Sequence, residues 1–383
     1  MTAAPDSQIT APPEPAEPAG PAGPAVRPAG AEADGSRWSR LRGPAAFVAV
    51  ALLVLVVAPL LLEPFRLGLL AKYLTYAIVA LGIGLAWGKG GMLTLGQGVF
   101  FGLGGYAMGM YLKLNDAGGD LPDFMVWSGV ERLPALWKPF GNPVFAIGMV
   151  LVLPFAVALL LGVLVFRQRV RGAYFAILTQ ALAAAMVILL VGQQGLTGGT
   201  NGLTNFFDFF GNDLATEETQ RGLYLLVATV LGVLYLLAWQ LVRSRFGRLL
   251  VAVRDGEDRV RFLGYNPATV KTLTFAVSAG MAGIAGALFV PVVGIISPAL
   301  LGVVPSLELV VAVAVGGRFA LAGAVLGAVV MGYARTYFSE ELPDAWLYLQ
   351  GALFILVMTL APRGLTGLAG TLRQAWKSRR AAA

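Results

Sequence analysis

Apolar stretches long enough to cross a membrane recur along the chain, separated by short polar segments. A membrane-crossing helix needs about 20 mostly apolar residues. The stretch 304–337 is too long for one crossing and is interrupted by "GGRFA" at 316–320, so it is divided into two helices. The pattern predicts an all-α polytopic bundle of about ten transmembrane helices. The windows are 44–62, 67–87, 91–112, 143–166, 173–192, 222–241, 272–293, two within 304–337, and 345–361.

The two ends of the chain differ from this pattern. The first 36 residues are rich in Pro, Ala, Gly and acidic residues, and such a composition cannot bury enough apolar surface to fold. We therefore predict a disordered cytoplasmic tail over 1–43, a membrane domain over 44–361 with a cytoplasmic loop at 242–271, and a basic cytoplasmic tail over 362–383.

Composition supports the membrane interpretation and removes several kinds of chemistry. Hydrophobic residues make up 57% of the 383 positions and charged residues only 13%. Cysteine and histidine are both absent, which excludes disulfides, thiol nucleophiles, imidazole bases and the usual zinc ligands. No catalytic residue and no metal site are predicted. The net charge of +7 suggests no nucleic-acid partner, because the basic residues lie between apolar windows rather than along one soluble face.

Positive charge in the short loops predicts the orientation of the helices, since cytoplasmic loops collect Lys and Arg. The basic segments are "RWSRLR", "GKGG", "RQRVRG", the loop after Arg243, "GGRFA" and "RQAWKSRR", whereas the alternate segments are acidic or nearly balanced. Ten crossings with both termini in the cytoplasm satisfy all of these loops.

A glycine-rich segment, "GKGGMLTLGQGVFFGLGGYA" at 88–107, could be mistaken for a phosphate-binding loop. It lacks the G-x-x-x-x-G-K-[ST] spacing of a P-loop. Its glycines instead form small-x-x-x-small pairs, Gly98 with Gly102 and Gly105 with Gly109, which let backbones approach closely in a membrane. The amide of Gln97 must find partners in this apolar setting.

Three further polar positions interrupt apolar windows. Thr179 and Gln180 lie within the window 173–192, where they either join helices through a hydrogen bond or line a path for a small uncharged solute. Glu308 lies near the start of its window and is either a carboxylate at the membrane interface or an acceptor facing a solute. A proton relay is the less favoured role, because no second carboxylate and no histidine accompany Glu308 in its window.

The loop after Arg243 predicts an amphipathic helix. Phe246, Leu249, Leu250 and Val253 follow the spacing i, i+3, i+4, i+7, and Gly264 suits a helix end. The apolar stripe fits a helix lying on anionic lipid. The mixed charges of "RDGEDR" favour instead a docking element for a soluble partner.

Six motifs in order give the chain a family resemblance. They are "TLGQGVFFGLGGYA", "RGAYFAILTQALA", "FGRLLVAVRDGEDRVRFLGYN", "SAGMAGIAGALF", "SPALLGVVPSLELVVAVAVGGR" and "FSEELPDAWLYLQGALFILV". Between about residues 67 and 368 the chain resembles the permeases of branched-chain amino-acid and urea ABC importers, most closely the second permease subunit of the urea branch.

The resemblance implies partners that the chain itself does not contain. These are a second homologous permease, two ATPase subunits that bind ATP and Mg, an external urea- or amino-acid-binding protein, and membrane lipid; no cofactor is expected in this chain. The amphipathic helix would dock on an ATPase. The residues assigned to that contact by the resemblance are Gly247, Arg248, Ala252, Arg254, Asp255 and Gly264.

We therefore predict a multi-pass permease of a bacterial inner membrane, built as two inverted repeats, that moves urea or a related small amide by alternating access. "LTQALA", "SLELV" and "FSEELPDAWLY" favour urea, whereas "TGGTNGL" and "GGRFALAG" leave branched-chain amino acids as the alternative. A secondary transporter or channel without an ATPase is the rival from another class. The residues predicted to line the path are Thr94, Gln97, Thr179, Gln180, Ser306 and Glu308.

Overall fold

A computed structural model describes residues 52–170, 172–341, 345–360 and 364–367. The predicted tails lie outside these residues, apart from one helical turn at 364–367, and so do residues 44–51 of the window 44–62. Within the described residues the regular structure is helical except for four two-residue strands, which confirms the all-α fold class.

Helices occupy each of the ten predicted windows. The long ones are α3 (Pro64–Ile83) with its continuation η2 (Gly84–Lys89), α4 (Gln97–Asp116), α6 (Pro143–Arg167), α7 (Ala173–Gly192), α9 (Glu217–Arg243), α10 (Arg245–Phe262), α11 (Pro267–Val293), α12 (Val303–Gly316), α13 (Leu321–Glu341) and α14 (Trp346–Leu360). The short helices are η1 (Leu53–Val57), α2 (Ala58–Leu61), α5 (Asp123–Trp127), η3 (Lys138–Gly141), α8 (Gln194–Thr197) and η4 (Pro298–Leu301). The strands pair antiparallel, β1 (Leu203–Thr204) with β4 (Ile295–Ile296) and β2 (Asp208–Phe209) with β3 (Asn212–Asp213).

Six helical segments of the described chain are long and apolar enough to cross a membrane: α3 with η2, α6, α7, α9, α11 and α13. The stretch 304–337 divides at 317–320 into the short α12 and the longer α13, as its polar interruption predicts. The total of ten crossings and the inverted repeats stay predictions.

The window 91–112 is wrong at its start, because α4 begins only at Gln97. Gly91 has a φ of 71° and Gly96 a φ of −120° with ψ 30°, so the backbone between η2 and α4 is not helical. This non-helical segment, 90–96, is called the break before α4. Irregular backbone at membrane depth is tolerated only where protein or water covers it, and Thr94 in the break is fully buried.

Two central helices are covered by the others. In their most apolar 18-residue windows, 83% of α3 with η2 and 78% of α11 is buried, against 22% of α7 and 28% of α9. α11 packs against α3, α4 and α6, and α3 packs also against α9 and α13. The helices with exposed apolar surface therefore surround α3 and α11.

Glycines bring α4 and α11 into backbone contact. A Cβ added at Gly104 would lie 2.0 Å from the carbonyl oxygen of Gly283, and one at Gly286 would lie 1.8 Å from that of Phe101. The pairs singled out in the sequence do promote close packing, but their neighbour is not one of the long helices: Gly98 and Gly102 face Leu301 of the short η4, and Gly105 and Gly109 face Ile296 of β4.

Side-chain caps set several of the helix starts. The Asn142 carboxamide accepts the Val144 N–H at 2.9 Å at the start of α6, and Asn266 accepts the Ala268 N–H at 3.0 Å at the start of α11. Ser244 is the single residue between α9 and α10, and its hydroxyl accepts the Gly247 N–H at 3.3 Å. Each cap satisfies an N–H group that the first helical turn leaves without a partner.

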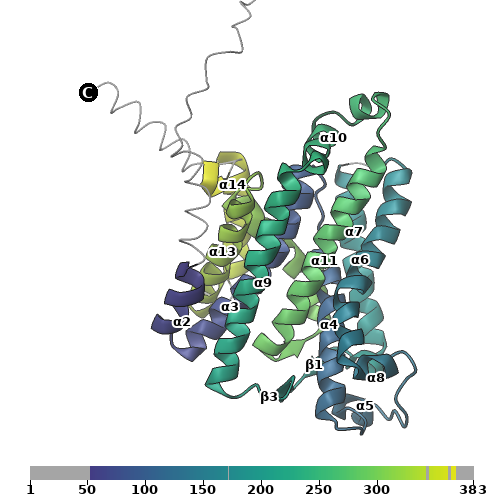
Figure 1. Cartoon of the computed structure of the whole chain (residues 1–383), viewed down its shortest axis with the longest axis vertical. Helices are drawn as coiled ribbons and strands as arrows, with labels where there is room; N and C mark the ends of the chain where they lie inside the picture. The colour runs from purple at the N-terminus through teal and green to yellow at the C-terminus, as the bar shows by residue number, and fades with distance from the viewer. Residues whose placement is uncertain (1–51, 171, 342–344, 361–363, 368–383) are drawn as a thin grey trace, which may run out of the picture. The chain divides into compact units, whose positions relative to one another are not determined.

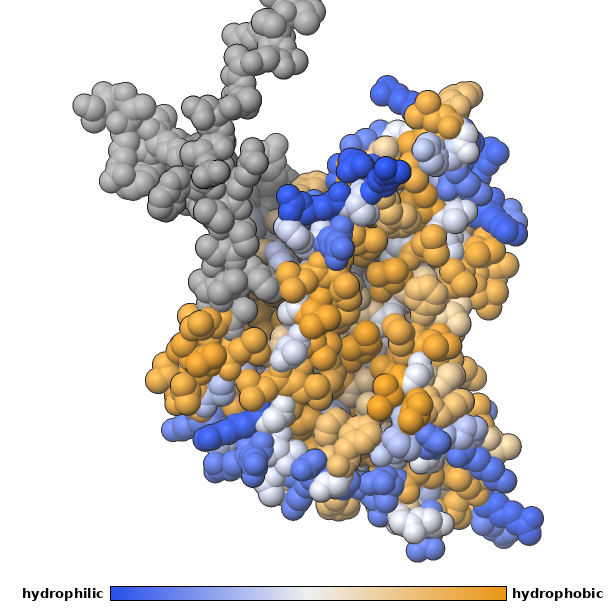
Figure 2. All heavy atoms as spheres, viewed as in Figure 1, coloured by the Kyte–Doolittle hydropathy of each residue, from blue (hydrophilic) through white to orange (hydrophobic). Residues whose placement is uncertain are grey.

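The polar segments gather at the two ends of the helices (Figure 1). α10 and the segments 88–91 and 317–320 meet at one end, which is called the basic end; the Arg254 guanidinium there donates to the Gly88 carbonyl oxygen at 2.8 Å. α5, α8 and β1 lie at the other end. Figure 2 shows a hydrophobic band between these two hydrophilic zones. Three of the predicted basic segments, namely 88–91, α10 and 317–320, thus share one end, as the charge pattern predicts.

The backbone contact between α4 and α11 makes a stability prediction. Gly286→Ala should destabilise the fold by about 1–3 kcal/mol, because the new methyl group overlaps the Phe101 carbonyl. Gly232→Ala in α9 is the matched control, since nothing lies within 4 Å of its added Cβ, and it should be neutral or stabilising by up to about 1 kcal/mol. Thermal unfolding in detergent measures both; equal melting temperatures for the two variants would contradict the prediction.

Candidate functional site

Four of the predicted path residues lie in tight packing around the break before α4. Gln97 and Ser306 are fully buried, and so is Thr94. The Gln97 side-chain N–H donates to the Ser278 hydroxyl on α11 at 2.9 Å, and the Ser306 hydroxyl on α12 accepts the Gly98 N–H at 3.1 Å. The Thr179 hydroxyl on α7 accepts the Leu95 N–H at 3.0 Å. These contacts join the break and the first turn of α4 to three other helices.

The break and the first residue of α4 nevertheless keep unused hydrogen-bonding capacity. The Gln97 carboxamide oxygen and the Thr94 hydroxyl are buried and have no partner within the described part of the chain. Gln180, next to Thr179, is partly exposed. None of these five residues lines the cavity described next. The interhelical role left open in the sequence therefore accounts for most of their contacts.

A cavity of about 530 Å³ lies between α3, α11, α12, α13 and α14. This volume falls within the range of about 300–1,000 Å³ typical of small-molecule sites. Aromatic rings form part of the wall, with Tyr76 stacked on Phe289 at 5.6 Å between centroids. The polar residues that line it are Lys72, Tyr73, Tyr76, Glu308, Arg335, Thr336, Ser339, Glu340 and Gln350.

Charged groups from three helices meet in this cavity. The Arg335 guanidinium on α13 forms an ion pair with Glu308 on α12, whose side chain is only 16% exposed. Lys72 on α3 lines the same space and has no carboxylate within 4 Å among the described residues. The cavity therefore offers an ion pair and an additional ammonium group within an apolar bundle.

Two neutral contacts complete the lining. The hydroxyl groups of Tyr73 and Thr336 share a hydrogen bond between α3 and α13. The Gln350 carboxamide oxygen on α14 is buried without a partner in the described chain, and that residue is 6% exposed. The wall can thus donate hydrogen bonds to a bound solute and accept hydrogen bonds from it.

Of the six predicted path residues, only Glu308 lines this cavity. Sequence reasoning missed Lys72, Arg335 and Gln350. The signal was present for Lys72 and Arg335, since each is a charge within an apolar window, as Glu308 is. Their convergence could not be read from the sequence, because the three charges come from separate helices.

The apolar stripe of α10 packs on the chain's own bundle. Leu250 and Val253 are buried against Leu85 of η2, with Phe246 and Leu249 partly buried beside them. Neither lipid nor a soluble partner is therefore needed to cover the stripe. Arg248, Ala252 and Asp255, at i, i+4 and i+7, are exposed on the other side of the helix.

The six residues that the resemblance assigns to ATPase contact have different environments. Gly247 is buried at the tight turn from α9, where an added Cβ would lie 2.2 Å from the Val242 carbonyl oxygen. Gly264 has a φ of 86° and follows the end of α10. Arg254 turns toward the bundle, whereas Arg248, Ala252 and Asp255 form an exposed face, called the free face of α10. A hydrogen bond from Arg254 holds the pKa of Asp255 below its ordinary value, so Asp255 is negative at neutral pH.

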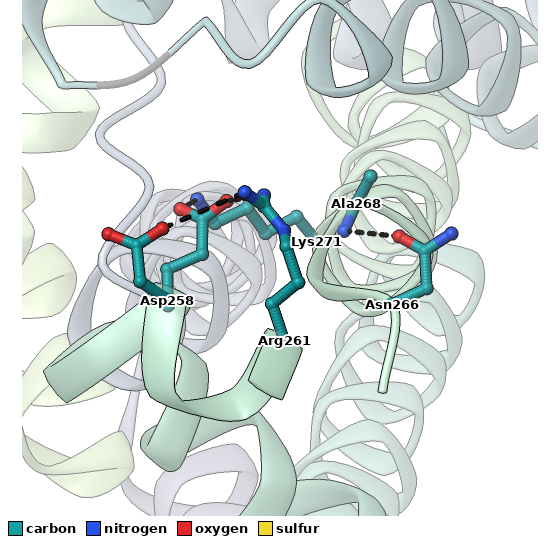
Figure 3. Close-up of polar contacts among 6 residues, drawn as sticks. Asp258, Arg261, Asn266, Ala268 and Lys271 are labelled. Atoms are coloured by element: carbon teal, nitrogen blue, oxygen red, sulfur yellow. Dashed lines mark hydrogen bonds and ion pairs between the residues drawn. The ribbon is translucent and has the colours of Figure 1, made fainter. Parts of the chain in front are cut away.

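An ion pair holds the second part of α10 to α11. The helix is interrupted at Gly256. After it, the Glu257 carboxylate accepts hydrogen bonds from Lys271 at 2.5 Å and from Arg261 at 3.3 Å. Figure 3 shows Arg261 between the carboxylate of Asp258 and Lys271, beside the Asn266 cap of α11. The free face is thus carried on a helix attached to the bundle on both sides of Gly256.

The bundle has an apolar band, a solute-sized cavity with polar groups in its wall, and the free face of α10 at its basic end. These features together are typical of membrane transport proteins. Comparison with known proteins identifies the family. The model of the branched-chain amino acid transport system permease component matches residues 65–358, and the chain belongs to this family.

Individual relatives agree with that assignment. The chain is 29% identical over 341 residues to the high-affinity branched-chain amino acid transport system permease protein LivM of Escherichia coli K12, covering 82% of this chain and 73% of the relative. It is 26% identical to LivH of Salmonella typhimurium, covering 76% and 91% respectively. A shorter match, 32% identity over 109 residues, joins it to the autoinducer 2 import system permease protein LsrC of Salmonella paratyphi B. No solved structure matches the chain.

The cavity charges make an asymmetric stability prediction. Glu308→Gln removes the carboxylate that pairs with Arg335 and leaves Arg335 and Lys72 with only the exposed Glu340 carboxylate in the described cavity lining, whereas Arg335→Gln leaves Lys72 with Glu308. We expect Glu308→Gln to be the more destabilising, by an amount between the roughly 1 kcal/mol of an exposed pair and the roughly 3–5 kcal/mol of a buried one, because Arg335 is 49% exposed. Unfolding of both variants in detergent measures the loss of stability. If Arg335→Gln were the more destabilising variant, the Glu308 carboxylate would not stabilise Lys72.

Proposed function

We propose that this chain is a permease subunit of an ATP-driven importer that moves a small polar solute across a bacterial inner membrane by alternating access. The observation that carries the proposal is the packing of α10. Its apolar stripe is already covered by the bundle, so the exposed Arg248, Ala252 and Asp255 remain as a polar surface at the basic end. A surface of that kind suits a soluble partner, and family membership supports an ATPase subunit in that place.

The partners follow from the same proposal. A second permease of the same family would complete the solute path, two ATPase subunits would bind ATP and Mg, and an external binding protein would deliver solute. Both termini would then lie in the cytoplasm with α10. The cavity between α3, α12 and α13 is the part of this chain where we place the solute, because it combines volume with hydrogen-bonding groups.

We propose urea as the solute. The motifs shared with the urea branch support it, and so does the chemistry of the cavity. Urea presents one carbonyl acceptor and several N–H donors. Lys72 and Arg335 can donate to its oxygen, while Glu308 and the Gln350 oxygen, which has no partner among the described residues, can accept from its N–H groups.

Branched-chain amino acids are the second candidate, and one observation favours them. Lys72 is an additional cation beside the Glu308–Arg335 pair, so the cavity could hold a carboxylate at Lys72 and an ammonium group at Glu308. Its apolar wall would suit an aliphatic side chain. The names of the relatives point to the same substrates.

Uptake of labelled urea and labelled leucine by the reconstituted complex separates the two solutes. If urea is carried, Glu308→Gln should keep part of the uptake, because an amide still accepts a hydrogen bond; a carried amino acid would lose the partner of its ammonium group.

Gln97→Leu should lower urea uptake if its free oxygen faces the path, and Gln180→Leu is the parallel variant on α7. Leucine uptake without urea uptake by the unmodified complex would reject urea, and unchanged urea uptake in both glutamine variants would reject their role in the path.

A charge reversal on the free face tests the ATPase contact against a transporter that works alone. Arg248→Glu should greatly reduce co-purification of the ATPase subunits and ATP-driven uptake, because it reverses a charge on the surface proposed to bind the ATPase while leaving the buried stripe intact. Arg221→Glu, also exposed but at the start of α9, is the matched control and should change neither. Full uptake by Arg248→Glu without bound ATPase would support the secondary transporter instead.

A further inference from the structure

One basic residue of α10 points into the protein. The Arg254 side chain is 27% exposed, and its guanidinium donates to the Gly88 carbonyl oxygen at 2.8 Å and to Asp255 at 2.8 Å. The guanidinium carbon also lies 5.8 Å from the centre of the Phe319 ring. Arg254 therefore contacts the end of η2 and the segment between α12 and α13 at the same time.

Those two segments are themselves in close contact. A Cβ added at Gly88 would lie 1.7 Å from the Arg318 carbonyl oxygen, so the backbones touch there. Arg318 in turn lies over the Trp87 ring at 5.0 Å. A displacement of either segment must move the other, because close-packed backbone cannot be compressed.

The same segments lead to the charged cavity. η2 continues α3, which carries Lys72, and residues 317–320 join α12, which carries Glu308, to α13, which carries Arg335. α-Helices are stiff along their axes, since their backbone hydrogen bonds run in that direction. Arg254 thus contacts η2, which continues α3, and the segment that joins α12 to α13, and these two segments lead to the three helices whose charges meet in the cavity.

We propose that Arg254 is a positioning residue that transmits movement of α10 to α3, α12 and α13, rather than a contact to the ATPase. The inference rests on the proposed function, in which a partner moves α10. The free face would receive the partner, and Arg254, on the side of α10 turned toward the bundle, would pass the movement to the cavity.

The side chain suits this role because of its shape. Arginine can donate from separate nitrogens in one plane and place its flat face on an aromatic ring, whereas lysine offers a single ammonium group. Arg254 uses Nη1 for Gly88, Nε for Asp255 and its flat group near Phe319. Arg254→Lys keeps the charge but cannot keep all three contacts, so it should be impaired as well.

Reconstitution of the complete complex tests the inference. Arg254→Gln should bind the ATPase subunits at the ratio of the unmodified protein and retain ATP hydrolysis, while solute uptake per ATP falls about tenfold, within the usual range of coupling energies. Arg248→Gln, on the free face, should instead lose ATPase binding. Arg259→Gln, an exposed arginine on the same element, should change neither. Loss of ATPase binding by Arg254→Gln, or unchanged uptake per ATP, would overturn the inference.

A second measurement does not depend on the ATPase. Hydrogen exchange of this chain in lipid nanodiscs should become faster at residues 317–320 in Arg254→Gln and also in Phe319→Leu, but not in Arg259→Gln. Exchange that stays unchanged in the first two variants would overturn the inference even if the complex carries solute. If the unmodified chain transports solute with no ATPase, the proposed function fails, and the exchange result still decides whether Arg254 holds this segment.

Discussion

Direct backbone contact between α4 and α11 is the constraint on which the other positions depend. Lipid supplies no hydrophobic drive for helices to associate, so close packing must hold them together. Gly104, Gly283 and Gly286 permit that approach, and the contact brings Gln97 to Ser278. Residues 296–301 then pack against the face of α4 that carries Gly98, Gly102 and Gly105. This contact fixes the start of α12 and with it the position of Glu308.

Polar groups inside the bundle lie in two different environments. Around the break before α4 they bond to one another and to backbone, because non-helical backbone in a membrane must be satisfied by protein. In the cavity they face open volume, and Lys72 and the Gln350 oxygen keep capacity for a solute. The first group joins helices, while the second group is where a transported molecule can be bound.

Prediction from sequence was strongest where one segment decides its own structure. The apolar windows predicted the helices, Gly264 the end of α10, and the polar interruption at 316–320 the division between α12 and α13. Prediction was weaker for the site. Thr94, Gln97, Thr179 and Ser306 were recognised as polar residues in apolar segments, but such a pattern cannot distinguish a hydrogen bond between helices from a residue lining a cavity.

The sequence by itself determined the class of the protein, the helices and the gathering of basic loops at one end, because hydrophobicity and charge act locally along the chain. Only the tertiary structure decided that Lys72, Glu308 and Arg335 share a cavity, that the stripe of α10 is covered by its own bundle, and that Arg254 points inward. These facts depend on distances between segments far apart in the chain, and those distances are set by how closely the helices pack.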